Sequence, residues 1–194
     1  MTESYQYYGV YRSCRDAAWR CCIDFGIDRL PVKLMAAARH MGIHVVRNSG
    51  VHELREGEFG ASIYNFDHWV IVYDDSLPAE ESRMVLAHEL GHILMGHEYK
   101  YASRRFISSG KQKSEHEADM FAIRLLAPAC VLHELNVLDA DGIAALCRIP
   151  RDAAVKRAAR MRTLEARQKF YQSKLETEAM NGFLPFIAEK RAGQ

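Results

Sequence analysis

The sequence lacks several features that would place it in a special class of protein. No apolar run approaches the roughly 20 residues that a transmembrane helix needs. Residues 1–16 do not show the charged and then apolar layout of a signal peptide. The net charge is only +1, which gives no global sign of a nucleic-acid or anionic membrane partner. We therefore expect a soluble, cytoplasmic protein.

The chain has few cysteines, and their spacing contains no pairing motif. The chain has five cysteines, an odd number, and none of them forms a CxxC pair. This argues against a disulfide framework and against a cysteine-rich zinc site, and we expect reduced, partly buried thiols. Internal repeats and low-complexity segments are also absent. With 194 residues, the chain fits one sizeable domain or a smaller domain with an appendage.

The order of predicted elements is helices, a small sheet and then helices, which is typical of an α+β fold. Segments rich in β-branched and aromatic residues predict strands at 43–47, 61–65 and 69–75, the last two as a hairpin. Apolar periodicity with Pro, Gly and Ser end signals predicts helices at 13–26, 31–42, 78–95 and 114–127. Pro31 and Pro78 fit first helical turns, and Ser114 fits an N-cap.

The C-terminal part predicts further helices. Residues 139–147 and 151–175 flank a short "RIP" break and have helix-turn-helix proportions, and residues 181–194 predict a turn and a frayed end. The pair is locally basic through Arg148, Arg151, Lys156, Arg157, Arg160 and Arg162. Packing of these helices on the domain is favoured over DNA contact. We expect a domain at 1–132 and a C-terminal helical extension at 133–194.

The stretch "VLAHELGHILMGH" carries the strongest chemical signal. His88 and His92 are four residues apart on a predicted helix, so their imidazoles lie on one face and can converge on one ion. Glu89 lies between them and points elsewhere, so it can accept a proton from water without binding the ion. This is the geometry of the HExxH motif, in which the glutamate is the general base.

A catalytic zinc site needs a third protein ligand and an open position. His97 is one candidate, but it follows His92 by five residues, which differs from the metzincin spacing. Glu115, in "SEHEADMFA", is the preferred candidate, and Glu117 competes with it from another face of the same helix.

Two further roles are predicted around this site. Asp119 lies one turn after Glu115, so we expect it to accept a hydrogen bond from the non-ligating nitrogen of His88 or His92. An oxyanion donor is also needed, and His97, Tyr99 and Tyr101 are the candidates.

A glycine and a strand complete the predicted surroundings. Gly91, within the helix, is destabilising by about 1 kcal/mol relative to alanine, and the close approach of a strand would explain it. The strand at 61–64 could then pair with an extended substrate. A buried strand without substrate contact fits the same pattern.

The motifs together resemble the ImmA/IrrE family of zincin-like metallopeptidases. The matching segments are "GIDRLPVKLMAAARHMGIHVV", "RMVLAHELGHILMGH" and "EHEADMFAIRLLAPACVL", within residues 25–132. The pair HELGH and E-x-x-A-D-x-F-A-x-x-L-L-x-P is specific in combination. One departure is Ala127, where the family usually has methionine before the proline.

The resemblance implies a fold, a site and an activity. The fold would be a zincin-like domain with a small mixed sheet packed on the HExxH helix. The metal ligands would be His88, His92 and Glu115, and Glu89 would be the catalytic glutamate. The cofactor would be one zinc ion, although another divalent metal would also suit the site. Family members commonly cut a helix-turn-helix repressor in mobile elements or stress responses, which implies a role in transcription regulation.

Two functions are consistent with these features. The first is a zinc-dependent endopeptidase that cuts such a repressor. The alternative is a regulator of the same fold that binds metal together with a repressor or DNA, without cutting. The presence of Glu89 favours the first, because a scaffold does not need a general base.

Overall fold

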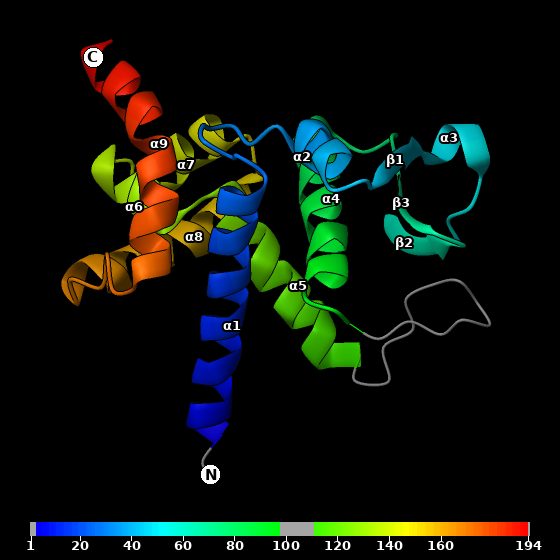
Figure 1. Ribbon diagram of the computed structural model, residues 1–194, viewed down its shortest axis with the longest axis horizontal. Coiled ribbons are helices and arrows are strands. Elements are labelled where there is room, and N and C mark those ends of the chain that lie inside the picture. The colour runs from blue at the N-terminus through cyan, green and yellow to red at the C-terminus, as the bar shows by residue number, and fades with distance from the viewer. Residues whose placement is uncertain (1–2, 98–110, 194) are drawn as a thin grey trace.

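The computed structural model describes residues 3–97 and 111–193 and has the predicted α+β architecture (Figure 1). Its helices are α1 (Glu3–Asp24), α2 (Leu34–His40), α3 (Asn48–Val51), α4 (Ala79–Leu94), α5 (Lys111–Leu126), α6 (Ala129–Glu134), α7 (Ala140–Cys147), α8 (Arg151–Ala166) and α9 (Lys174–Ala192). Its strands are β1 (His44–Arg47), β2 (Gly60–Asn65) and β3 (His68–Tyr73).

The sheet is small and mixed, with β3 between β1 and β2. β1 runs parallel to β3, whereas β2 runs antiparallel to it and forms the predicted hairpin. The turn contains Phe66 in the left-handed region, with φ of 59°. Among the described strands, β2 pairs only with β3, so its outer edge is free of strand pairing there.

Helix α4 lies between the sheet and α5 (Figure 1). It begins after Pro78, whose missing N–H is not needed at a helix start. The negative charges of Glu80 and Glu81 in the first turn interact favourably with the positive end of the helix dipole. Leu86 and Leu90 are buried. Because α4 is covered by the sheet and by α5, its buried polar residues, Glu89 and His92, must find partners inside the protein.

A single cluster of buried side chains extends from α1 to α9. Phe121, Leu125 and Leu126 of α5 are fully buried near its centre, and α1 packs against both α5 and α9. The cluster contains residues on both sides of residue 132, and the domain boundary there stays a prediction. In the described part of the chain, no helix combines the length and apolar character needed to cross a bilayer.

Three helices begin elsewhere than the sequence predicts, and α1 is the first of them, because it begins at Glu3 and not at residue 13. α2 begins at Leu34 and not at Pro31, because the chain bends at residues 29–31 and buries Leu30 and Val32 in the core. α5 begins at Lys111, so Ser114 lies inside the helix and is not its cap. A short helix, α3, also interrupts the connection that the sequence predicts to be irregular.

The C-terminal end differs most from the prediction. α8 ends at Ala166, and the segment predicted as a turn and a frayed end belongs to α9. Ser173 caps α9 by accepting a hydrogen bond from the backbone N–H of Glu176. Met180, Phe183 and Ile187 supply a buried stripe at helical spacing. This stripe stabilises α9 although Gly182 and Pro185 lie inside the helix.

Candidate metal centre

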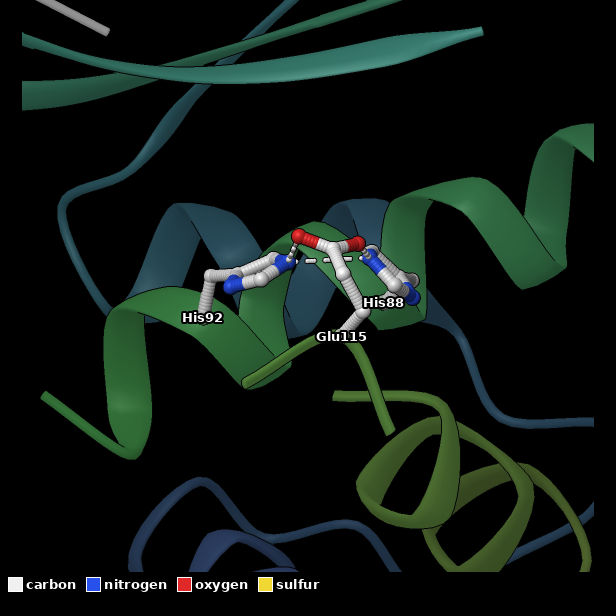
Figure 2. Close-up of side chains that lie close together, drawn as sticks. All are labelled: His88, His92 and Glu115. Atoms are coloured by element: carbon white, nitrogen blue, oxygen red, sulfur yellow. Dashed lines mark hydrogen bonds and ion pairs between the residues drawn. The ribbon is translucent and has the colours of Figure 1, made fainter. Parts of the chain in front are cut away.

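The two histidines of α4 and a glutamate of α5 converge on one point (Figure 2). His88 and His92 present their Nε2 atoms to each other at 2.9 Å. The Glu115 carboxylate lies across both rings, with Oε2 3.2 Å from Nε2 of His88 and Oε1 3.6 Å from Nε2 of His92. One ligand atom from each residue lies within 4.8 Å of the others.

This donor set fits a divalent metal ion. Two imidazole nitrogens and a carboxylate oxygen are ligands that zinc accepts, and three protein ligands leave a coordination position open. The Glu115 side chain is 47% exposed, so the site is accessible from solvent. Within the described residues, no other group of three or more His, Cys, Asp or Glu side chains meets the same distance condition.

The local charge also favours a cation at this point. Burial alone would lower the pKa of His88, but hydrogen bonds to Asp119 and Glu115 outweigh it and raise that pKa to about 10. The hydrogen bond to His88 in turn lowers the pKa of the Glu115 carboxyl. Burial and the neighbouring His88 lower the pKa of His92 to about 4. The carboxylates thus stabilise a positive charge at the position of His88, and a bound metal ion would replace the His88 proton as the source of that charge.

Close packing of α4 on α5 brings these side chains together, and Gly91 permits it. A Cβ atom at Gly91 would lie 3.1 Å from Cα of Ala118 and 3.1 Å from the Phe121 ring. The prediction that a strand approaches α4 at Gly91 is therefore wrong, because the neighbour is α5. The strand approaches α4 elsewhere, at Gly60, where a Cβ atom would lie 2.5 Å from Cγ1 of Val85.

Glu89 points away from the two histidines toward the sheet. It is 7% exposed, and Ser62 of β2 donates a hydrogen bond from Oγ to its Oε2 at 2.6 Å. The same hydroxyl lies 3.2 Å from the Glu89 backbone carbonyl. Burial raises the pKa of Glu89, and the Ser62 hydrogen bond opposes this shift. A carboxyl with a raised pKa beside a metal centre is suited to proton transfer.

Asp119 lies behind His88. Its Oδ1 atom is 2.8 Å from Nδ1 of His88, the nitrogen that does not face Glu115. The Asp119 side chain is 67% exposed. Its function as a support for His88 remains a prediction.

His97 and Glu117, the competing candidates for the third ligand, meet each other. The Nδ1 atom of His97 is 2.9 Å from Nδ1 of His92, and its Nε2 atom is 3.1 Å from Oε2 of Glu117. His97 therefore contacts the side of His92 opposite the converging Nε2 atoms, and Glu117 contacts His97 in turn. The predicted oxyanion donor His97 is engaged in these contacts, and Tyr99 and Tyr101 lie outside the described residues.

Sequence reasoning missed the contact of Ser62 with Glu89. Ser62 is fully buried on β2, opposite Ile71 of β3. The sequence shows only a serine within a predicted strand, and this does not identify its partner.

Two arginines of the basic helix pair in the C-terminal part make contacts within the protein. Arg157 is 5% exposed and donates from Nε to the Ala127 carbonyl at 2.7 Å. Arg151 lies 2.9 Å from Asp141. Burial of Arg157 removes one charge from the surface, whereas Arg151 remains on it with 70% of its side chain exposed, and DNA contact stays an unfavoured prediction.

Comparison with protein families gives one result. The sequence model of the IrrE N-terminal-like domain, a peptidase family, matches residues 38–159. The matched range includes α4, α5, all three strands and most of α8. None of the curated proteins matches the chain.

Proposed function

The chain belongs to the IrrE N-terminal-like family of peptidases, and from this membership we propose that it is a zinc-dependent endopeptidase whose substrate is a helix-turn-helix repressor. Membership implies a protein substrate, and the His88, His92 and Glu115 cluster indicates a divalent metal. The observation that carries the proposal is the placement of Glu89 beside this cluster with its carboxylate held by Ser62.

Each residue of the site has a definite task in this proposal. A bound zinc ion would supply a Lewis acid that polarises the peptide carbonyl and makes water a better nucleophile. His88, His92 and Glu115 would hold the ion and leave one coordination position open. Glu89 accepts the proton of the attacking water and then donates it to the nitrogen of the leaving amine. Ser62 keeps the Glu89 carboxylate in the orientation needed for both transfers.

The edge of the sheet offers a place for the substrate chain. β2 carries Ser62 and lies against α4, and the described strands leave its outer edge unpaired. An extended peptide that adds to this edge would lie along the metal site, and its backbone N–H and C=O groups would find partners on β2. Such binding needs a segment that can become extended, which a loop or linker of a repressor provides.

Co-expression with a candidate repressor tests the proposal. A small helix-turn-helix repressor encoded beside this protein should be cut by the wild type and remain whole with Glu89→Gln. The substitution removes the charge of the base while nearly keeping its size, so fold and metal binding should persist. The matched control is Glu165→Gln, because Glu165 is paired with His133 away from the site.

The outcomes separate the two functions. A repressor that is bound but left whole by the wild-type protein would support the non-cleaving regulator. Equal cleavage by wild type and Glu89→Gln would contradict the hydrolytic mechanism. A cytoplasmic location and a role in transcription regulation are parts of the same proposal.

A further inference from the structure

The C-terminal end of α4 places a second imidazole behind His92. Gly96, with φ of 66°, reverses the chain, and its N–H donates to the carbonyl of Ile93 at 3.2 Å. The N–H of His97 donates to the carbonyl of His92 at 3.1 Å. This pair of hydrogen bonds is the Schellman motif, in which residues at the positions of His92 and His97 usually make a hydrophobic contact. Here both are histidines, with ring centroids 5.0 Å apart.

The hydrogen bonds behind His92 form a continuous chain. When the Nε2 atom of His92 offers its lone pair to a metal, its Nδ1 atom carries the proton. That N–H can donate to Nδ1 of His97, 2.9 Å away. The remaining proton of His97 is then on Nε2, which donates to Oε2 of Glu117 at 3.1 Å. Every donor in this chain has an acceptor, so the arrangement selects one tautomer of His92.

A helix end alone does not require these groups. An apolar residue would complete the Schellman contact, whereas an imidazole and a carboxylate must be desolvated. The His97 and Glu117 side chains are only 8% and 15% exposed. Among the described residues, Lys113 also lies near Glu117, at 3.9 Å with 62% of its side chain exposed. The two residues thus bury polar groups inside the protein on the Nδ1 side of His92.

We propose that His97 and Glu117 are positioning residues, which fix the tautomer and orientation of His92 for metal binding. The inference rests on the metal centre of the proposed function and adds two residues to it. The metal-ligating histidines of proteins are commonly held by a partner on the second nitrogen, and loss of such a partner weakens metal binding about 10–100-fold.

Zinc affinity of the full chain tests the inference without any cleavage assay. Zinc would be partitioned between the protein and a chromogenic chelator of known affinity, and the visible spectrum of the cobalt-substituted protein would report the ligand field. His97→Phe keeps a ring but removes the acceptor. His97→Asn keeps an acceptor near the position of Nδ1. Glu117→Gln keeps the size and an acceptor oxygen but removes the charge.

The control uses an equivalent pair elsewhere. His133 lies 2.7 Å from Glu165 and stacks on Phe170, outside the metal centre. His133→Phe removes a histidine that pairs with a carboxylate, as His97 does, but whose side chain is more exposed, at 36%, and it does not touch α4. Circular dichroism would establish that each variant is folded.

The expected order of affinities is definite. His97→Phe should bind zinc about 10–100-fold more weakly than the wild type, and its cobalt spectrum should change. His97→Asn should recover most of the affinity, Glu117→Gln should lose less than His97→Phe, and His133→Phe should match the wild type.

Other results would overturn the inference. A folded His97→Phe protein with wild-type zinc affinity and an unchanged cobalt spectrum would contradict it, as would equal losses in His97→Phe and His97→Asn. Complete loss of zinc in Glu117→Gln would make Glu117 a ligand instead. Failure of the proposed function is distinguishable: a wild-type protein that binds zinc but cuts nothing leaves the inference standing, whereas one that binds no zinc overturns both.

Discussion

His88 and His92 belong to one motif and lie one turn apart on α4, yet their surroundings differ. His88 is 20% exposed and has a carboxylate near each ring nitrogen, Glu115 at one and Asp119 at the other. His92 is 3% exposed, and its Nδ1 atom faces another imidazole. Accordingly, the pKa of His88 is raised to about 10, despite burial, by hydrogen bonds to the carboxylates, whereas burial lowers that of His92 to about 4.

The comparison shows that motif spacing brings two ligands together but does not set their environment. The environment comes from what packs behind each ring. For His88 this is a carboxylate open to solvent, and for His92 it is a buried pair of side chains. The two histidines should therefore be equally necessary for metal binding but respond differently when their supports are changed.

The largest effect is expected from removing a ligand. His88→Ala, His92→Ala and Glu115→Ala should each reduce the zinc content of the purified protein from near one equivalent to almost none. Each loss should exceed the about 10–100-fold weakening that a supporting residue causes. Metal analysis after dialysis measures this. Zinc retained in Glu115→Ala but lost in Glu117→Ala would show that the third ligand is misassigned.

The next effect concerns the support of His88. Asp119→Ala should still bind zinc but about 10-fold more weakly, near the lower end of the range for such residues. The reason is that Asp119 is 67% exposed, so water can replace it as the acceptor for His88. Chelator competition on Asp119→Ala and His97→Phe side by side would sharpen the comparison. Unaltered affinity in Asp119→Ala would show that His88 needs no protein support.

A smaller effect, on rate alone, is expected from Ser62→Ala. Its hydroxyl donates to Glu89 and not to a metal ligand, so zinc affinity should be unchanged. A hydrogen bond to a charged group contributes about 1.5–3 kcal/mol. If part of this contribution is lost from the transition state, cleavage should slow about 10-fold. The matched control is Ser49→Ala, because Ser49 makes an equivalent 2.6 Å bond to Asp75 on the surface. A wild-type rate in Ser62→Ala would exclude a positioning role.

The smallest effect is expected for a carboxylate away from both histidines. Hydrogen bonds from Tyr171 and Arg191 lower the pKa of Glu134. Its contribution to stability is therefore present above its unfolded pKa and lost as the pH falls through the lower folded pKa. Glu134→Gln should lose less than about 1 kcal/mol at neutral pH, with no change in zinc affinity.

Thermal unfolding at several pH values checks this prediction. The difference in unfolding temperature between wild type and Glu134→Gln should shrink in acid, because the protonated wild-type carboxyl is then neutral, as the glutamine amide is. A difference that grows as the pH falls would contradict the assigned direction of the pKa shift.

Much of this arrangement was predictable from the sequence, for reasons that particular residues illustrate. His88, Glu89 and His92 form a local pattern on a helix with clear end signals, and the hairpin of β2 and β3 follows from alternating strand residues and a short turn. The family match supports the same fold and a metallopeptidase-like domain. These features depend on short-range spacing, which the sequence displays directly.

The remaining features depend on contacts between distant segments. The partner of Ser62 is set by how β2 packs on α4, and no spacing rule gives that contact. The contact of His97 with His92 depends on the chain reversal at Gly96. In α9, Gly182 and Pro185 predict a turn, but burial of Phe183 and its neighbours in the core outweighs those local preferences.

The most direct test of the central claim is the position of the metal itself. Crystals of the zinc-loaded protein, with data collected on both sides of the zinc absorption edge, would give an anomalous difference map. The account predicts a single strong peak bound by Nε2 of His88, Nε2 of His92 and the Glu115 carboxylate, with Glu89 close by but not a ligand. A peak held by His97 or Glu117 in place of Glu115, or no peak between the two histidines, would contradict it.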